Sequence, residues 1–275
     1  MVIASTLNNP QQLGGLTSEF WENGRSETCP IYDMHGHMGT FHSIYFPRAE
    51  AEGMLTTMDE AGVKLLVFSH HHALFAPEVG NQASIKAVRR YPQRLRAYCV
   101  INPNYPEFIA RDLESFDQYR DVFVGLKFLP DYHQIAVNDE RYRPAWEYAE
   151  AHHLLLLMHT WGSSPYNGAA VIRSVAGRYP HVKLLLGHSI HGDWDAAVQL
   201  VRDFPNLYLE LTAVFDDRGI IEKFAAEAGS ERMLFGTDLP WFDPQHAIGV
   251  LMSAKISDED RHNICHRNAE KLLAL

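Results

Sequence analysis

The run LLLLMH at residues 154–159 is a continuous apolar segment of strand length that ends in a histidine. A segment of this kind is typical of a parallel strand buried on both faces. Seven other runs share this character: PIYDMH (30–35), KLLVFSH (64–70), LRAYCVIN (95–102), VFVGLKFL (122–129), VKLLLGH (182–188), LYLELTA (207–213) and MLFGTD (233–238). Consecutive runs end 25–35 residues apart, which is about one strand–helix–strand step each.

The segments between these runs have helical patterns, and three of them close on Tyr-Pro or Phe-Pro. The residue before a proline avoids the helical region, so these dipeptides indicate helix ends. Eight strand–helix steps predict an α/β protein with a (β/α)8 TIM barrel. A doubly wound open sheet is the alternative, but its GxGxxG motif is missing after the first run. We expect a single barrel domain over residues 30–275, preceded by a polar, irregular N-terminal extension over residues 1–29.

The composition disfavours several classes of partner. The 275 residues are 46% hydrophobic, enough for a sizeable core, and the formal net charge is −10. This acidic balance argues against nucleic acid and anionic membranes as partners. The three cysteines are far apart, and the N-terminus lacks the basic and apolar regions of a signal peptide. Since no apolar run approaches the roughly 18 residues that span a bilayer, we expect a cytoplasmic protein with no membrane partner.

Polar side chains gather at the C-terminal ends of the predicted strands. They belong to five different strands: His35, His37, Lys127, His159, His188 and Asp238. In a barrel these strand ends meet at one mouth, where active sites lie. Each residue alone has a structural explanation, as a core histidine, a turn cap or a snorkelling lysine. Together they predict a catalytic site.

Four of these side chains form a donor set of three imidazoles and one carboxylate. We expect His35, His37, His159 and Asp238 to bind one divalent metal ion, with Zn²⁺ preferred and Mn²⁺, Fe²⁺, Co²⁺ or Ni²⁺ as alternatives. A metal ion in an open site lowers the pKa of its bound water toward neutrality. His188 is placed to orient that water or polarise the substrate, and Asp238 to take the proton.

Six segments of the chain resemble the amidohydrolase superfamily, in its amidohydrolase 2 branch of TIM-barrel metal-dependent hydrolases. They are DMHGH (33–37), GLKFLPDYH (125–133), DERYRPAWEYAEAHHLLLLMHT (139–160), LLLGHS (184–189), LFGTDLPW (234–241) and HRNAEKLL (266–273). The resemblance implies an amidohydrolase-like catalytic domain over residues 30–275, and it assigns His35, His37, His159 and Asp238 as core metal ligands.

The same resemblance bears on two further residues. His188 matches a histidine that acts on the substrate or the water in mononuclear members and binds a second metal in binuclear ones. Lys127 lies where binuclear members carry a carbamylated lysine that bridges two metals. We expect one metal, with Lys127 facing the site or the substrate; a second metal with carbamylated Lys127 is the less favoured alternative.

Two reactions are compatible with this site. We expect a metal-dependent hydrolase of a small-molecule amide, ester or lactone, with Asp238, His188 and Lys127 as catalytic residues. The alternative is a metal-dependent non-oxidative decarboxylase of an aromatic or unsaturated carboxylic acid, because the branch resembled includes such carboxy-lyases. Several of those decarboxylases have Glu in place of the first histidine, so His35 favours hydrolysis slightly.

Further residues beyond the strand ends are candidates for substrate contact, namely His70, Tyr132, Trp161 and Trp241. Packing under a loop is the competing explanation for each of them. We expect a small-molecule substrate, and homo-oligomerisation stays open, as does the role of residues 1–29.

Overall fold

A closed sheet of eight parallel strands forms the centre of the protein in the computed structural model, which describes residues 15–275. The strands pair in chain order and are β1 (Ile31–Met38), β2 (Val63–His70), β3 (Leu95–Val100), β4 (Phe123–Phe128), β5 (Leu155–Trp161), β6 (Lys183–His191), β7 (Leu207–Glu210) and β8 (Met233–Leu234). The ring closes between the last strand and the first: Met34 N–H donates to Phe235 O over 2.9 Å and His37 N–H to Leu239 O over 2.7 Å. The predicted (β/α)8 TIM barrel is confirmed.

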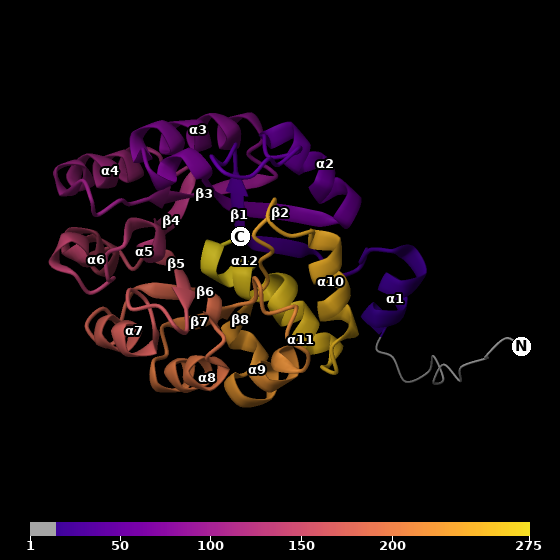
Figure 1. Ribbon diagram of the computed structural model, residues 1–275. Coiled ribbons are helices and arrows are strands. Elements are labelled where there is room, and N and C mark those ends of the chain that lie inside the picture. The colour runs from indigo at the N-terminus through magenta and orange to yellow at the C-terminus, as the bar shows by residue number, and fades with distance from the viewer. Residues whose placement is uncertain (1–14) are drawn as a thin grey trace, which may run out of the picture.

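Helices alternate with the strands and form a ring outside the barrel (Figure 1). The α-helices are α1 (Gly15–Asn23), α2 (Ala51–Ala61), α3 (Pro77–Arg90), α4 (Pro106–Gln118), α5 (Pro130–His133), α6 (Arg143–Ala151), α7 (Ala169–Ala176), α8 (Trp194–Asp203), α9 (Ile220–Ala228), α10 (Pro244–Ser253), α11 (Asp258–His262) and α12 (Asn268–Leu273). Short 3₁₀ turns are η2 (His71–Leu74), η3 (Glu140–Tyr142) and η4 (Ser230–Arg232), and η5 (Asn263–Arg267) is a π-helical turn. As predicted, α3 and α8 end just before Tyr91 and Phe204, each followed by proline. The third helix of this kind, α7, ends earlier than predicted, at Ala176 and not next to Tyr179.

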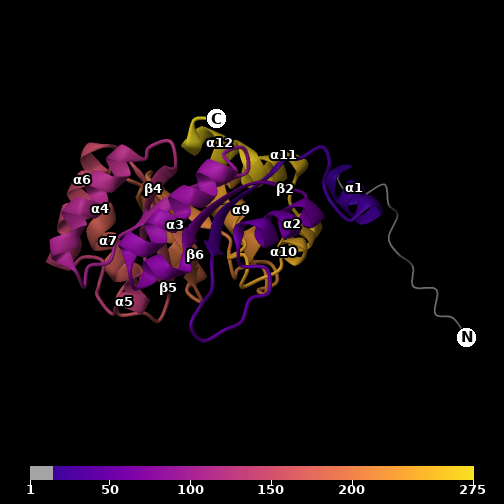
Figure 2. The ribbon, with the colours of Figure 1, turned by 90° about the horizontal axis from the view of Figure 1, so that it is seen from above.

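The apolar residues divide into two layers because side chains alternate across each strand. One layer lies between the strands and the surrounding helices. The other fills the barrel interior, where Tyr32, Leu65, Leu155 and Leu185 pack together. Ala269 of α12 belongs to this interior cluster, so α12 closes one end of the barrel. Figure 2 shows that α12 and the loop after β1 lie at opposite ends, which leaves the mouth on the side of that loop.

The structure departs from the sequence-based expectations at β8 and at the N-terminus. The run at 233–238 forms only two residues of strand, because Thr237 N–H bonds to the side chain of Asp33 over 3.1 Å in place of the β1 backbone. Asp238, with a left-handed φ of 63°, then ends the extended run. The extension is not wholly irregular, since α1 buries Leu16 and Phe20, and Thr17 Oγ1 donates to Met252 O over 2.6 Å.

The remaining part of the expected extension, residues 1–14, lies outside the described residues. The division at residue 29 therefore stays a prediction. Within residues 15–275, no helix has both the length and the apolar character needed to cross a bilayer.

Candidate active site

Inward-facing side chains change from apolar to polar toward the mouth of the barrel. On β5, Leu155 and Leu157 belong to the interior apolar cluster, and His159 follows two residues later. On β7, Tyr208 packs against the same cluster and Glu210 follows it. Because side chains two apart on a strand share a face, the same alternation that builds the core places ionisable groups at the mouth.

A register shift in β1 turns two histidines toward the inside of the barrel, on the side of Tyr32 and Met34. Asp33 pairs with Leu66 and Gly36 with Phe68, so three steps along β1 match two along β2. A bulge of this kind re-aims the side chains that follow it. His35 and His37 consequently both reach the mouth from a single strand.

Three donor atoms converge at this point. His35 Nε2 and His37 Nε2 lie 3.3 Å and 3.0 Å from Asp238 Oδ1, and the three atoms are within 4.8 Å of one another. Asp238 Oδ1 is buried, and no described donor is aligned on it for a hydrogen bond. An electron-rich cluster with an orphaned carboxylate oxygen fits a cation.

The electrostatics agree with that fit. Burial holds the pKa of His35 well below its usual range, and the ammonium of Lys127 lowers it further. Burial would raise the pKa of Asp238, but His35 and His37 outweigh it and hold that pKa well below its usual range. A neutral imidazole and an ionised carboxylate are the forms that bind divalent metals.

Glu210 orients His35 from behind and was missed by the sequence analysis. Its Oε2 lies 2.8 Å from His35 Nδ1 and accepts from His188 N–H over 3.2 Å. Its Oε1 accepts from the N–H and the hydroxyl of Thr212, both over 2.7 Å. Burial raises the pKa of Glu210, whereas His188 and the hydrogen bonds from Thr212 and His188 favour its ionised form. With Glu210 ionised, His35 carries its proton on Nδ1, and Nε2, which faces Lys127 Nζ, keeps the lone pair that can bind a metal.

Lys127 lies directly beside the cluster. Its Nζ is 2.8 Å from His35 Nε2 and the side chain is fully buried. Burial lowers its pKa to about 8, although Asp238 and Glu210 favour the charged form. The expected orientation of Lys127 toward the site is what the structure shows.

His159 and His188 form a second pair, 3.0 Å apart between Nδ1 of the first and Nε2 of the second. His159 Nε2 is 3.4 Å from Asp131 Oδ2, a carboxylate that the sequence analysis did not single out. His159 lies outside the group of three converging atoms, so its role as a fourth ligand stays a prediction.

The backbone at His188 is strained in a way that is common at functional sites. His188, Ser189 and Ile190 have φ values of 66°, 49° and 56°, a region that L residues with side chains rarely adopt. His188 Nδ1 is buried, with no hydrogen-bond partner among the described residues. This nitrogen is free to meet a ligand.

A small aromatic cavity lies over the cluster. Its volume is about 30 Å³, and its lining includes His70, Tyr132 and Trp241, three of the four predicted substrate contacts, with Phe41 and His71. The fourth, Trp161, lines an open depression of about 380 Å³ that shares Tyr132 and His159 with the inner cavity. The two hollows therefore adjoin at Tyr132 and His159.

His71 is a further pocket residue whose position the sequence left undecided. Its ring stacks on that of His37, with centroids 5.1 Å apart and 7° between planes. Trp241 Nε1–H donates to its Nε2 over 3.0 Å, and its own Nδ1 lies 2.7 Å from Gly39 O. These bonds fix a flat aromatic wall beside the cluster.

A larger depression of about 730 Å³ lies on the outside of the barrel, lined by residues of α1 and α10 such as Phe20 and His246. It shares no lining residue with the inner cavity. The convergence of donor atoms, and not the size of a hollow, therefore locates the site.

Comparisons with known proteins identify the family. A sequence profile described as amidohydrolase matches residues 32–275. The gamma-resorcylate decarboxylase of Polaromonas sp. (strain JS666 / ATCC BAA-500) is 25% identical over 320 residues, covering 95% of this chain and 93% of that protein. The enzyme of the same name from Rhodococcus jostii (strain RHA1) is 22% identical, covering 99% and 96%.

Solved structures show the same fold. A 2,6-dihydroxybenzoate decarboxylase complexed with 2,6-dihydroxybenzoate has a TM-score of 0.74 at 16% identity, over 90% of this chain and 99% of that one. A dihydroxybenzoic acid decarboxylase from Polaromonas sp. JS666, with bound manganese and the inhibitor 2-nitroresorcinol, has a TM-score of 0.74 at 19% identity, over 90% and 97%.

These findings overturn the expectation of a hydrolase. The relatives that match nearly the whole chain carry the names of decarboxylases, so the alternative reaction is favoured. The histidine at position 35 was a poor guide, because a metal-dependent decarboxylase and a hydrolase use the same kinds of ligand. The preference for zinc is not confirmed either, since the solved decarboxylase holds manganese.

Proposed function

The chain belongs to the amidohydrolase family, and we propose that within it this protein is a metal-dependent, non-oxidative decarboxylase of a hydroxylated aromatic carboxylic acid. The observation that carries the proposal is the match of two gamma-resorcylate decarboxylases along 95% and 99% of the chain. The aromatic cavity over a cluster of histidines supports it independently.

We propose that His35, His37 and Asp238 hold one divalent ion, with His159 as the fourth ligand. Imidazole and carboxylate donors suit Mn²⁺ as well as Zn²⁺, and the solved neighbours with manganese favour Mn²⁺. When bound, the ion supplies a positive charge that neutralises the substrate carboxylate and a neighbouring hydroxyl oxygen.

The flat wall of the cavity suits an aromatic ring. His71 and Trp241 offer stacking surfaces, and Lys127 supplies a fully buried amine beside the cluster. The inner cavity of about 30 Å³ is smaller than the roughly 150 Å³ of a cavity known to bind benzene. A substituted aromatic ring therefore needs more room than the inner cavity offers, and the outer depression of about 380 Å³, which shares Tyr132 and His159 with it, is the adjoining space.

Decarboxylation replaces a carboxylate with a proton on the same ring carbon. The proton adds to that carbon, the bond to the carboxylate breaks, and its electrons return to the ring as CO₂ leaves. Asp238 is the one carboxylate among the described residues that line the inner cavity. Its second carboxylate oxygen, Oδ2, which lies outside the converging cluster, accepts a proton from a phenol or from solvent and returns it to the ring carbon, while the free Nδ1 of His188 bonds the substrate.

The test uses the Mn²⁺-loaded protein with 2,6-dihydroxybenzoate and a panel of other hydroxybenzoates in D₂O. We expect CO₂ release and a phenol that carries deuterium at the carbon that lost CO₂. Absence of CO₂ from every hydroxybenzoate, together with turnover of lactones or esters, would contradict the proposal.

A further inference from the structure

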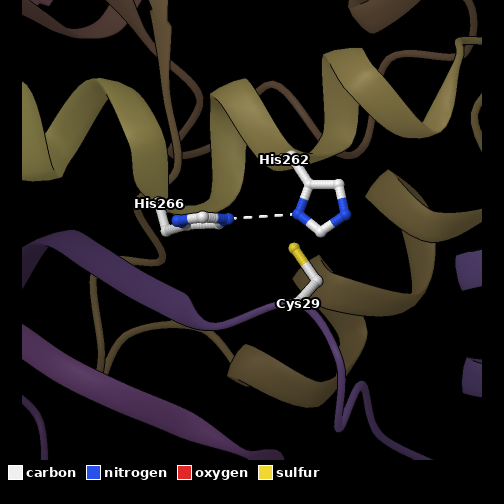
Figure 3. A group of neighbouring side chains, drawn as sticks. All are labelled: Cys29, His262 and His266. Carbon is white, nitrogen blue, oxygen red and sulfur yellow. Dashed lines mark hydrogen bonds between the residues drawn. The ribbon is translucent and has the colours of Figure 1, made fainter.

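A second group of metal-binding side chains lies at the closed end of the barrel. Cys29, two residues before β1, faces His262 of α11 and His266 of η5 (Figure 3). Cys29 is buried and the two histidines are half-buried. This end lies opposite the mouth, so the group is separate from the active site.

The distances within the group suit a shared metal ion. Cys29 Sγ and one nitrogen from each imidazole lie within 4.8 Å of one another. His262 Nδ1 and His266 Nε2 are 3.1 Å apart. Two nitrogens at about 2.0–2.1 Å from a tetrahedral zinc ion would lie roughly 3.3 Å apart. The imidazoles therefore need little movement to take up an ion between them and the sulfur.

Hydrogen bonding within the protein accounts for these groups poorly. Among the described residues, the sulfur has a long contact of 3.8 Å with Pro30 O and a contact with the thiol of Cys265. His266 Nδ1 lies 3.1 Å from Glu270 Oε1 but is not aligned with it for a hydrogen bond. A carboxylate behind the far nitrogen of a histidine is the usual partner of a metal-binding imidazole.

The local backbone also differs from a regular helix. His262 is the last residue of α11, and His266 lies within the π-helical turn η5 (Asn263–Arg267), which separates α11 from α12. Single π turns inside helices occur often at functional sites. Here the turn sets the direction of His266 relative to His262.

We propose that Cys29, His262 and His266 form a second metal site that binds Zn²⁺, with water in the fourth position. A donor set of one thiolate and two imidazoles binds Zn²⁺ in preference to Mn²⁺. The active site, by contrast, offers no sulfur ligand. The ion joins the segment before the first strand to the helices that close the barrel, so its role is to stabilise the closed end.

Co²⁺ in place of Zn²⁺ tests the proposal, because a cobalt–thiolate bond gives a near-ultraviolet charge-transfer band that the sulfur-free active site cannot give. Reduced, metal-free protein is titrated with Co²⁺ and then with Zn²⁺. We expect the band in the native chain, its removal by Zn²⁺, and its loss in Cys29→Ser. Cys265→Ser is the matched control, because the Cys265 thiol contacts Cys29 but lies outside the group of converging atoms. We expect the Cys265→Ser variant to keep the charge-transfer band.

His262→Gln provides a second variant in case Cys29→Ser does not fold, since His262 is half-buried on a surface helix. We expect it to weaken Co²⁺ binding at the thiolate site by roughly tenfold or more. The proposal is wrong if the native chain shows no charge-transfer band or if the band survives in Cys29→Ser. A disulfide between Cys29 and Cys265 in the purified protein, detected by counting free thiols, would also overturn it.

Discussion

Replacing Glu210 by glutamine tests whether the residue behind His35 controls the metal site. The substitution keeps the shape and removes the charge. Four donors point at the native carboxylate, from His35, from the backbone of His188 and twice from Thr212. An amide has only one oxygen, so one side of the group must now present an NH₂ to existing donors.

Both orientations of the amide weaken the site. If the NH₂ faces His35, the proton of that imidazole moves to Nε2, the atom expected to bind the metal. If the NH₂ faces Thr212, the backbone N–H of Thr212 loses its acceptor. His35 is then left with a neutral amide oxygen in place of a carboxylate. A buried donor without a partner costs about 1–3 kcal/mol. Loss of a partner behind a metal ligand lowers metal affinity roughly 10–100-fold, which corresponds to about 1.4–2.8 kcal/mol.

The assay is calorimetric titration of metal-free protein with Mn²⁺, with urea unfolding of the metal-free form as the measure of stability. Thr212→Val is the matched control, because it removes one hydroxyl bond to Oε1 and leaves the face toward His35 intact. We expect the control to lose about 1 kcal/mol of stability and to bind Mn²⁺ as the native chain does. Native Mn²⁺ affinity in folded Glu210→Gln would refute the reasoning, and equal losses in both variants would point to general loosening of the barrel.

Three further predictions concern the ligands, the buried lysine and acid stability. His37→Ala removes one of the converging donors, and we expect roughly 100-fold weaker Mn²⁺ binding; elemental analysis that finds stoichiometric Mn²⁺ after dialysis would contradict it. Lys127→Met removes a buried amine beside His35, and kcat/KM for decarboxylation should fall roughly 100-fold without a lower melting temperature; unchanged kinetics would exclude a role for the amine. Burial lowers the pKa of His133 from 6.5 to about 4. The unfolded chain therefore binds a proton at this residue more readily than the folded chain does. As the pH falls from 6.5 to about 4, the free energy of unfolding should drop by roughly 3 kcal/mol on account of this residue. Urea unfolding of His133→Gln should show a flatter pH dependence between these values, and an unchanged slope would count against the assignment.

The barrel was predictable because its signal is repeated. Each buried strand needs an apolar run, and eight such runs at similar spacing leave little choice of fold. The last strand shows the limit of this signal. MLFGTD is apolar enough for six residues of strand, but it meets β1, whose register shifts at Asp33. Thr237 N–H donates to the Asp33 carboxylate over 3.1 Å, so a side chain replaces a ladder bond there.

The placement of a side chain at the mouth was predictable where that side chain ends a strand, and unpredictable where it supports another residue. His35, His37 and Asp238 converge as the strand-end rule implies. Glu210 also ends a strand, but a lone carboxylate in LYLELTA has no pattern that marks it as a partner of His35. Gly236 shows how closely the two segments fit, because a Cβ at this position would lie 2.0 Å from Glu210 Oε1. Such fit between distant segments exists only once the barrel has closed.

The reaction could not be predicted from the ligands because hydrolysis and decarboxylation place the same demand on them. The two reactions differ in what surrounds the substrate. Hydrolysis requires a water molecule against the carbonyl carbon, whereas decarboxylation requires a proton donor at a ring carbon and a cavity that excludes water. The walls of the inner cavity, formed by Phe41, His71 and Trp241, come from three separate loops. Their spacing of about 5–6 Å between ring centroids follows from the fold as a whole, and this closed aromatic wall is the feature that suits a flat ring and a dry reaction.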